Sequence, residues 1–177
     1  RRDLLTHEYS YLPAQQALAE NDFVECLGAE EEWVVASRQR AGEGRVFAVV
    51  ELATRTFTEL CCDERGCVLA VQRDTRLRLL YVLLRREEEC RLLGWCLAKR
   101  KLLARSALKL TAMRLAPHPI RPRVLTLLGP VSVRLVEMKA GSGGFWEKKG
   151  LEMVRPAEER LLDLAWLEGA GPARLLV

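Results

Sequence analysis

The chain has 177 residues, of which 49% are hydrophobic and 29% are charged. This length and balance fit one globular domain with a sizeable core and exclude a largely disordered chain. A formal net charge of +4 favours an anionic ligand or partner but falls short of the strongly basic surface of a dedicated nucleic-acid binder. Because the chain begins with Arg1 rather than Met, we interpret residues 1–177 as a single domain of a longer protein.

The first half of the chain is predicted to contain one helix followed by four strands. Residues 12–27 have the apolar spacing of a helix. The runs EWVVASRQ (32–39) and RVFAVVELATRTF (45–57) flank the polar turn RAGEG and indicate a β-hairpin. CVLAVQRD (67–74) and LRLLYVLLR (77–85) are predicted to be two further strands.

The second half is predicted to alternate helices and strands. Apolar residues at helical spacing from Leu93 to Leu115 predict a long helix, with Lys99, Arg100, Lys101 and Arg105 on its polar side. VLTLLG (124–129) and VSVRLVEM (131–138) are predicted strands. A short helix at Phe145 and Trp146, a strand after Gly150 and a last helix over 156–167 complete the order.

This order of elements predicts a mixed α/β sheet without an internal repeat. The first strands are mostly antiparallel, and the long helix forms a crossover between the strands at 77–85 and 131–138. A strand–helix–strand crossover implies that these two strands are parallel neighbours.

The six cysteines do not have the spacing of a zinc site. Cys61 and Cys62 are adjacent, Cys67 is five residues further on, and His7 and His118 are the only histidines. We therefore expect no metal and interpret the cysteines as reduced, mostly buried residues of an intracellular protein.

The segment REEECRLLGWC contains a candidate phosphate site. Gly94 is predicted to lie where the chain turns into the long helix, and Arg91 lies just before it. The first amides of a helix bind phosphate groups, and a glycine lets a phosphate approach the backbone closely. The alternative is an arginine and a glycine that precede a helix by chance.

Two motifs in this part of the chain resemble the GNAT acetyltransferase superfamily. RLLGWC matches the pyrophosphate-binding pattern R/Q-x-x-G-x-G/A, with Cys96 in the last, small-residue position. VRLVEMKAGSGGFWEKKGLEMV (133–154) is similar to the stretch of the family that ends in F-Y-x-K-x-G-F before the last strand, with Trp146 in place of tyrosine. The resemblance covers roughly residues 79–155.

The resemblance implies a GNAT-like α/β fold, in which a mixed central sheet with two splayed parallel strands is flanked by helices, and it implies acetyl-CoA as the cofactor. Strand amides would hold the acetyl group, and the loop and helix start would hold the pyrophosphate. The implied cofactor-binding residues are Val82, Leu83, Leu84, Arg91, Leu92, Leu93, Gly94, Trp95, Cys96 and Trp146. Lys99, Arg100 and Lys101 are either a solvated helix face or contacts to the 3′-phosphate of coenzyme A.

Glu51 and Glu137 are the candidate general bases, because both lie within apolar strand runs where burial would raise a carboxyl pKa. The alternative for each is a solvent-facing strand residue; Glu59 is a weaker third candidate.

The predicted function is acetyl-CoA-dependent N-acetyl transfer to a protein lysine, such as one in a histone tail. The departures from the consensus favour a divergent eukaryotic branch of the family, for example the kinetochore-associated histone acetyltransferases of kinetoplastids. We expect a nuclear protein if the substrate is a histone, and otherwise a cytoplasmic one, with neither nucleic acid nor membrane as a partner. The alternative is an inactive GNAT-fold protein-interaction module, which Trp146 and Cys96 favour. A thermal-shift assay with acetyl-CoA would separate the two, because only a cofactor-binding enzyme should gain stability.

Overall fold

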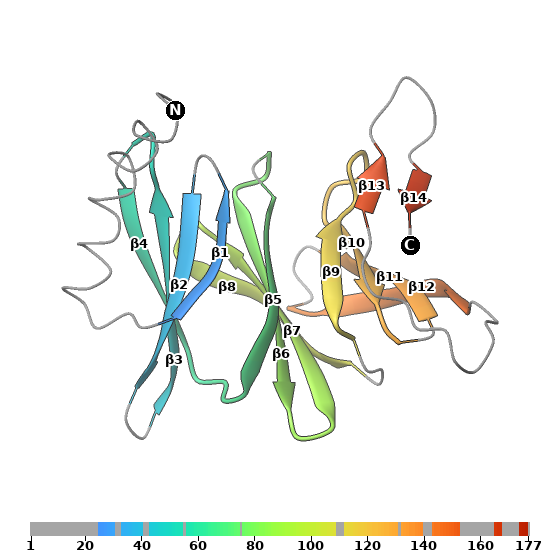
Figure 1. Ribbon diagram of the computed structural model, residues 1–177, viewed down its shortest axis with the longest axis horizontal. Coiled ribbons are helices and arrows are strands. Elements are labelled where there is room, and N and C mark those ends of the chain that lie inside the picture. Colours follow the sequence, from blue (N-terminus) through green and yellow to red (C-terminus); the bar gives the residue numbers. More distant parts are fainter. Residues whose placement is uncertain are drawn as a thin grey trace, which may run out of the picture. The chain divides into compact units, whose positions relative to one another are not determined.

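The computed structural model describes residues 25–30, 33–40, 43–54, 56–74, 76–108, 112–130, 132–139, 143–152, 165–167 and 174–176. Throughout these ranges the secondary structure is strand and turn, and no helix occurs in them (Figure 1). The strands are β1 (Glu25–Glu30), β2 (Trp33–Arg40), β3 (Glu43–Glu51), β4 (Thr56–Cys62), β5 (Cys67–Asp74), β6 (Leu79–Arg86), β7 (Glu89–Cys96), β8 (Lys101–Leu108), β9 (Arg114–Pro117), β10 (Val124–Leu128), β11 (Ser132–Met138), β12 (Phe145–Glu152), β13 (Ala165–Leu167) and β14 (Arg174–Leu176).

The chain divides into two compact units, unit 1 over Arg1–Arg65 and unit 2 over Gly66–Val177. Unit 1 contains one antiparallel sheet with the strand order β1-β2-β3-β4. The predicted hairpin is confirmed, because β2 pairs antiparallel with β3. Small and branched side chains of this sheet, Ala36, Val46 and Ala48, form a buried cluster against which Phe57 packs.

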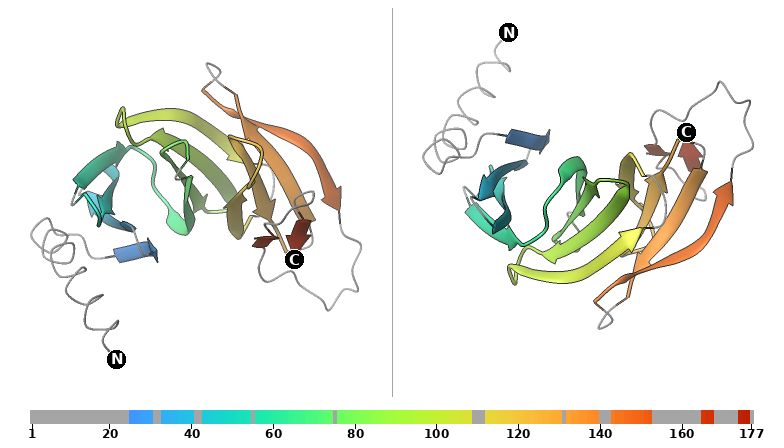
Figure 2. Two further views of the ribbon diagram at one scale, coloured as in Figure 1. Left: turned by 90° about the horizontal axis from the view of Figure 1, so that it is seen from above. Right: turned by 90° about the horizontal axis from the view of Figure 1, so that it is seen from below.

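Unit 2 contains two four-stranded antiparallel sheets, in the orders β5-β6-β7-β8 and β12-β11-β10-β9, and the antiparallel pair β13-β14. The two larger sheets pack face to face, as successive curved layers in Figure 2, with edge strand β5 beside β9 and β8 beside β12. Their shared core is built from both sheets and includes Tyr81, Leu83, Leu92, Leu125, Leu127, Val136 and Met138.

The continuous apolar run in β6 reflects burial of the strand on both of its faces. Successive strand residues point to opposite faces of a sheet. Tyr81 and Leu83 belong to the shared core, while Leu80 and Val82, on the opposite face, are 0% exposed. Strand β10 is likewise buried at every position. The strands predicted at 67–74, 77–85, 124–129 and 131–138 are confirmed.

The long helix predicted from Leu93 to Leu115 is wrong. This stretch contains the end of β7, the strand β8 and the start of β9. The helical spacing arose because the run of cations 99–101 lies at the turn between β7 and β8, where Arg100 has φ 50°. A polar turn between a largely buried strand and a half-buried one spaces the apolar residues much as a helix does.

The predicted α/β fold with a parallel crossover is also wrong. The described strands form antiparallel sheets, and the runs 77–85 and 131–138 lie in different sheets. The short helix predicted at Phe145 and Trp146 is the first part of β12. Of the helices predicted over 12–27 and 156–167, residues 25–27 and 165–167 are strand, and the rest lies outside the described residues.

The three four-stranded sheets share one strand order, in which each strand pairs with the next along the chain. Within unit 2, two such sheets stack face to face with their first strands, β5 and β9, side by side. Adjacent blades of a β-propeller are organised in this way. The structure thus contains a repeated architectural unit that the sequence does not reveal as a repeat.

Candidate functional site

Gly94 does not lie at the start of a helix. It is in the middle of β7, paired with Tyr81 of β6 and Ala104 of β8. A Cβ at Gly94 would lie 3.1 Å from Cζ of Phe145 and 3.2 Å from Sδ of Met138. This glycine therefore makes room for side chains of the other sheet, and its role in the structure is packing.

The other residues assigned to acetyl-CoA also lie within paired strands. Val82, Leu83 and Leu84 are in β6, which pairs along its length with β5 and β7, so the predicted splay between parallel strands is absent there. Leu92, Leu93, Trp95 and Cys96 are in β7. Arg91 lies in the same strand, with its guanidinium 3.7 Å from the carboxylate of Glu89.

The two candidate bases lie in different units. Glu51 ends β3 in unit 1 and accepts a hydrogen bond of 3.2 Å from the hydroxyl of Thr54. Glu137 lies in β11 of unit 2, paired with Val124 and Trp146. Both side chains are partly exposed. Glu59 is exposed and pairs with Arg38 at 3.4 Å.

The aromatic pair in β12 divides its side chains between core and solvent. Phe145 packs on the shared core, with its ring 6.3 Å from that of Tyr81 in an edge-to-face arrangement. Trp146 is 55% exposed, and Nζ of Lys139 lies 4.5 Å from the centre of its ring. This alternation is the ordinary consequence of a strand.

One end of unit 2 concentrates positive charge. The four loops at this end connect β5 to β6, β7 to β8, β9 to β10 and β11 to β12. They contain no Asp or Glu, and their cations are all exposed: Arg76, Arg78, Lys99, Arg100, Arg121, Arg123 and Lys139. We call these four loops the basic end of unit 2.

Three of these arginines have a left-handed backbone. The values of φ are 52° for Arg78, 50° for Arg100 and 63° for Arg123, and each residue directly precedes a strand. An L-residue with a Cβ pays on the order of 1 kcal/mol in this region, where glycine is favoured. The sequence therefore keeps an arginine at three turns where glycine would be less strained.

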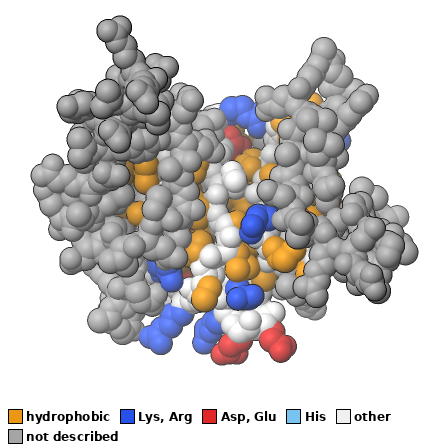
Figure 3. All heavy atoms as spheres, viewed as in Figure 1, with side chains coloured by type: hydrophobic (Ala, Val, Ile, Leu, Met, Phe, Trp, Pro, Cys, Tyr) orange, Lys and Arg blue, Asp and Glu red, His pale blue; other side chains and the backbone are white. Residues whose placement is uncertain are grey.

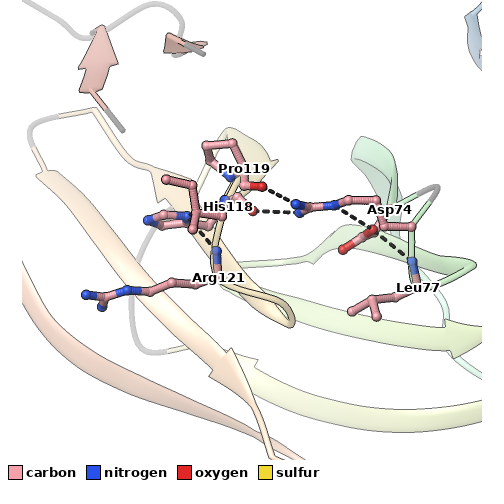
Figure 4. Close-up of polar contacts among 7 residues, drawn as sticks. Asp74, Leu77, His118, Pro119 and Arg121 are labelled. Atoms are coloured by element: carbon pink, nitrogen blue, oxygen red, sulfur yellow. Dashed lines mark hydrogen bonds and ion pairs between the residues drawn. The ribbon is translucent and has the colours of Figure 1, made fainter. Parts of the chain in front are cut away.

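The β5–β6 and β9–β10 loops are held together by a polar network (Figure 4). Arg76 donates hydrogen bonds to the carbonyl oxygens of His118, at 3.1 Å, and Pro119, and its Nε lies 3.8 Å from Oδ1 of Asp74. Asp74 is buried, and the same oxygen accepts a hydrogen bond of 3.1 Å from the Leu77 amide. This network fixes the positions of two of the four basic loops.

His118 completes the network from inside the β9–β10 loop. Its Nδ1 accepts hydrogen bonds of 3.1 Å from the amides of both Ile120 and Arg121. Burial, followed by the charges of Arg121 and Arg76, lowers the pKa of His118, so the imidazole is held neutral. A neutral Nδ1 is needed, because a protonated nitrogen cannot accept.

Tyr81 lies in the shared core, close enough to Asp74 of the network and Arg123 of the basic end for their charges to affect its pKa. Burial, and then the charge of Asp74, raise its pKa, while the charge of Arg123 opposes the shift. Its hydroxyl is buried and has no hydrogen-bonding partner among the described residues. Tyr81 is therefore a neutral phenol at physiological pH.

A cavity of about 340 Å³ opens at the basic end, between the two sheets. Most of its lining is apolar, from Leu77, Leu79, Cys96, Leu103 and Met138. The remaining lining residues are the cations Lys99, Arg123 and Lys139. An apolar pocket with a few charged groups is the usual form of a ligand site, and this volume lies at the lower end of the usual range.

The opposite end of the β5–β8 sheet carries charges of both signs, because the exposed Arg85 and Arg86 precede its glutamates. The β6–β7 hairpin carries Glu87, Glu88 and Glu89, all exposed, and Glu87 has φ 56°. Figure 3 shows acidic and basic side chains next to each other at the lower edge of the view, where this hairpin lies in Figure 1. The two ends of the sheet therefore differ, because the loops of the basic end carry cations alone and the β6–β7 hairpin carries both signs.

Sequence reasoning noticed only part of the basic end. Lys99, Arg100 and Lys101 were placed on a helix face, whereas Arg76, Arg78, Arg121, Arg123 and Lys139 were not assigned. A usable signal was present, because a cation directly precedes each of the runs that form β6, β8 and β10. In the described part of the chain, no three His, Cys, Asp or Glu side chains gather as a metal site would require.

No protein-family model matches the chain, and no curated protein sequence matches it significantly. No helix among the described residues is long and apolar enough to span a membrane.

Proposed function

We propose that this chain is a β-propeller-type protein-interaction module, and that the basic end of unit 2 binds an acidic segment of a partner protein. Support for the scaffold comes from the two face-to-face four-stranded sheets with adjacent first strands. Loops at the end of a rigid sheet scaffold are frequent binding surfaces. Acetyl transfer stays a prediction. The helix and the splayed parallel strands on which it was based do not occur at the predicted positions.

The observation that carries the proposal is the placement of Arg78, Arg100 and Arg123 at strained turns of one end. Strained residues that persist often serve function at the expense of stability. Seven exposed cations with no acidic residue in the same loops create a field that attracts an anionic partner.

A protein partner is favoured over a nucleic acid. Proteins that bind single strands stack bases on several exposed aromatic rings. Trp146 is the one large aromatic side chain that is exposed among the residues whose side chains the structure describes. The cavity floor is aliphatic, which suits an amino-acid side chain better than a base.

The test is a fluorescence-anisotropy titration of the whole chain with a labelled peptide of alternating glutamate and serine. The triple variant Arg78→Glu, Arg100→Glu, Arg123→Glu should lower affinity on the order of a hundredfold at low salt, with each site contributing up to about fivefold. The matched control is Arg85→Glu with Arg86→Glu, which are exposed at the opposite end of β6.

Equal affinity in the triple variant and the control would overturn the proposal. So would an oligothymidine of matched charge that binds the wild-type chain more tightly than the peptide, since this result would identify a nucleic-acid site. Added salt should weaken peptide binding, because the contacts are exposed and therefore screened.

A further inference from the structure

The cavity and the cations at the basic end belong to one surface. Leu77 and Leu79, from the β5–β6 loop and β6, line the cavity, and Arg78 lies between them in the chain. Across the cavity, Met138 lines it as the last residue of β11, and Lys139 follows at the rim. A ligand that enters the apolar floor therefore passes directly between positive charges.

The three cations of the cavity come from three different loops. Lys99 lies in the β7–β8 loop, Arg123 in the β9–β10 loop and Lys139 in the β11–β12 loop. Lys139 also lies over the exposed ring of Trp146, which positions its ammonium group at the rim. Cations on separate sides of an apolar opening match a ligand that carries negative charge on both sides of an apolar group.

We infer that the cavity binds one large apolar side chain, leucine or phenylalanine, of a peptide segment in which acidic residues flank that anchor. The inference rests on the proposed function and names the part of the partner that enters the pocket. The apolar anchor would be buried against Leu79, Leu103 and Met138, while flanking carboxylates meet Lys99, Arg123 and Lys139. A buried anchor with a charged rim is the usual energetic layout of a peptide site.

The first experiment compares two labelled peptides that differ in one residue. Both alternate glutamate and serine, and the central residue is leucine in one and alanine in the other. The leucine peptide should bind the whole chain about tenfold more tightly, which is the affinity gained by burying the larger side chain. Equal affinities would overturn the inference.

The second experiment fills the cavity from inside. Cys96 lines it and is partly exposed, so Cys96→Phe should remove the preference for the leucine peptide while binding of the alanine peptide stays within about twofold. The matched control is Cys67→Phe, because Cys67 is exposed at the start of β5, at the opposite end of the same sheet. An unchanged preference in Cys96→Phe would contradict the inference.

A third measurement does not depend on the Phe variant folding. In a chain with Cys26→Ser, Cys61→Ser and Cys67→Ser, the rate of alkylation of Cys96 by N-ethylmaleimide is followed by mass spectrometry. Saturating leucine peptide should slow this rate about tenfold or more, since about nine-tenths or more of the cavities are then filled. Alanine peptide at an equal bound fraction should slow it much less. Equal protection by both peptides would overturn the inference.

The two proposals fail in different ways. If charge reversal abolishes binding but the leucine and alanine peptides behave alike, the basic end binds acidic segments and the anchor is wrong. If charge reversal has no effect, the proposed function fails whatever the peptides do.

Decanoate, which joins an apolar chain to one carboxylate, serves as a competitor. Displacement of the leucine peptide by micromolar decanoate would identify a small amphiphile as the ligand instead.

Discussion

Arg100 and Glu87 both lie in turns between strands of the same sheet, yet they lie at opposite ends and carry opposite charges. Both have a left-handed backbone, with φ 50° for Arg100 and 56° for Glu87. The β7–β8 hairpin opens onto the apolar cavity, whereas Arg86–Glu89 form a polar surface. Backbone geometry is therefore shared between the ends, and side-chain charge together with the cavity distinguishes them.

The largest effect is expected from a change in the core that supports both ends. Gly94→Val should destabilise unit 2 by about 3 kcal/mol, because the new side chain would collide with Phe145 and Met138. The measurement is urea unfolding followed by the intrinsic fluorescence of the chain. If Gly94→Val unfolded at the wild-type midpoint, the close packing of the two sheets at this glycine would be refuted.

A smaller effect is expected from the network that holds the basic loops. Asp74→Ala removes the acceptor for the Leu77 amide and the carboxylate beside Arg76, so the free energy of unfolding should fall by about 1–2 kcal/mol. Glu88→Ala, an exposed change at the other end, should leave it within about 0.5 kcal/mol. If both variants lost a similar free energy of unfolding, the Asp74 contacts would stabilise the basic end no more than an exposed side chain stabilises the β6–β7 hairpin.

Replacing the strained turn residues by glycine tests the comparison directly. Arg100→Gly and Glu87→Gly should each stabilise the chain by up to about 1 kcal/mol, since glycine relieves the left-handed strain. Affinity for the acidic peptide should fall up to about fivefold in Arg100→Gly and stay or rise in Glu87→Gly. A loss of affinity in Glu87→Gly would show that the ends do not differ in function.

The smallest effect concerns pH. The pKa of His118 is lowered in the folded chain, so folding favours its neutral form and its contribution is present above the unfolded pKa of about 6.5. That contribution is lost as the pH falls through the folded pKa, below about 6.5. Between about pH 7.5 and 5.5 the wild-type urea midpoint should therefore drop more than that of His118→Asn, whose amide oxygen still accepts. An equal drop in both would contradict the role given to His118.

The sequence predicted strands well where the pattern was unambiguous. The apolar runs of β2, β3, β5, β6, β10 and β11 were identified because they are rich in valine and leucine and bounded by polar turns. It failed at β7 and β8, where the stretch from Leu93 to Leu108 has helical spacing by coincidence. That one error created the parallel crossover and, with it, the α/β fold.

The candidate site was harder to predict, because it depends on strand order. Leu79, Lys99 and Met138 are far apart in the chain. They line one cavity only because the two sheets of unit 2 pack with the β5–β6, β7–β8, β9–β10 and β11–β12 loops at the same end. Gly94 shows the opposite problem. A glycine five residues before a cationic run resembles a phosphate loop, and only the other sheet reveals that Phe145 occupies the space above it.

Phe145 lies in the core and Trp146 in solvent, so the positions of both rings depend on the pairing register of β12 with β11. Sliding this strand by one residue against β11 would exchange the two rings, sending the indole into the centre of unit 2 and the phenyl ring into water. Insertions or deletions between Lys139 and Phe145 should therefore be tolerated only if the loop itself absorbs the added or lost length. The length of that loop is therefore constrained by the two aromatic residues that follow it.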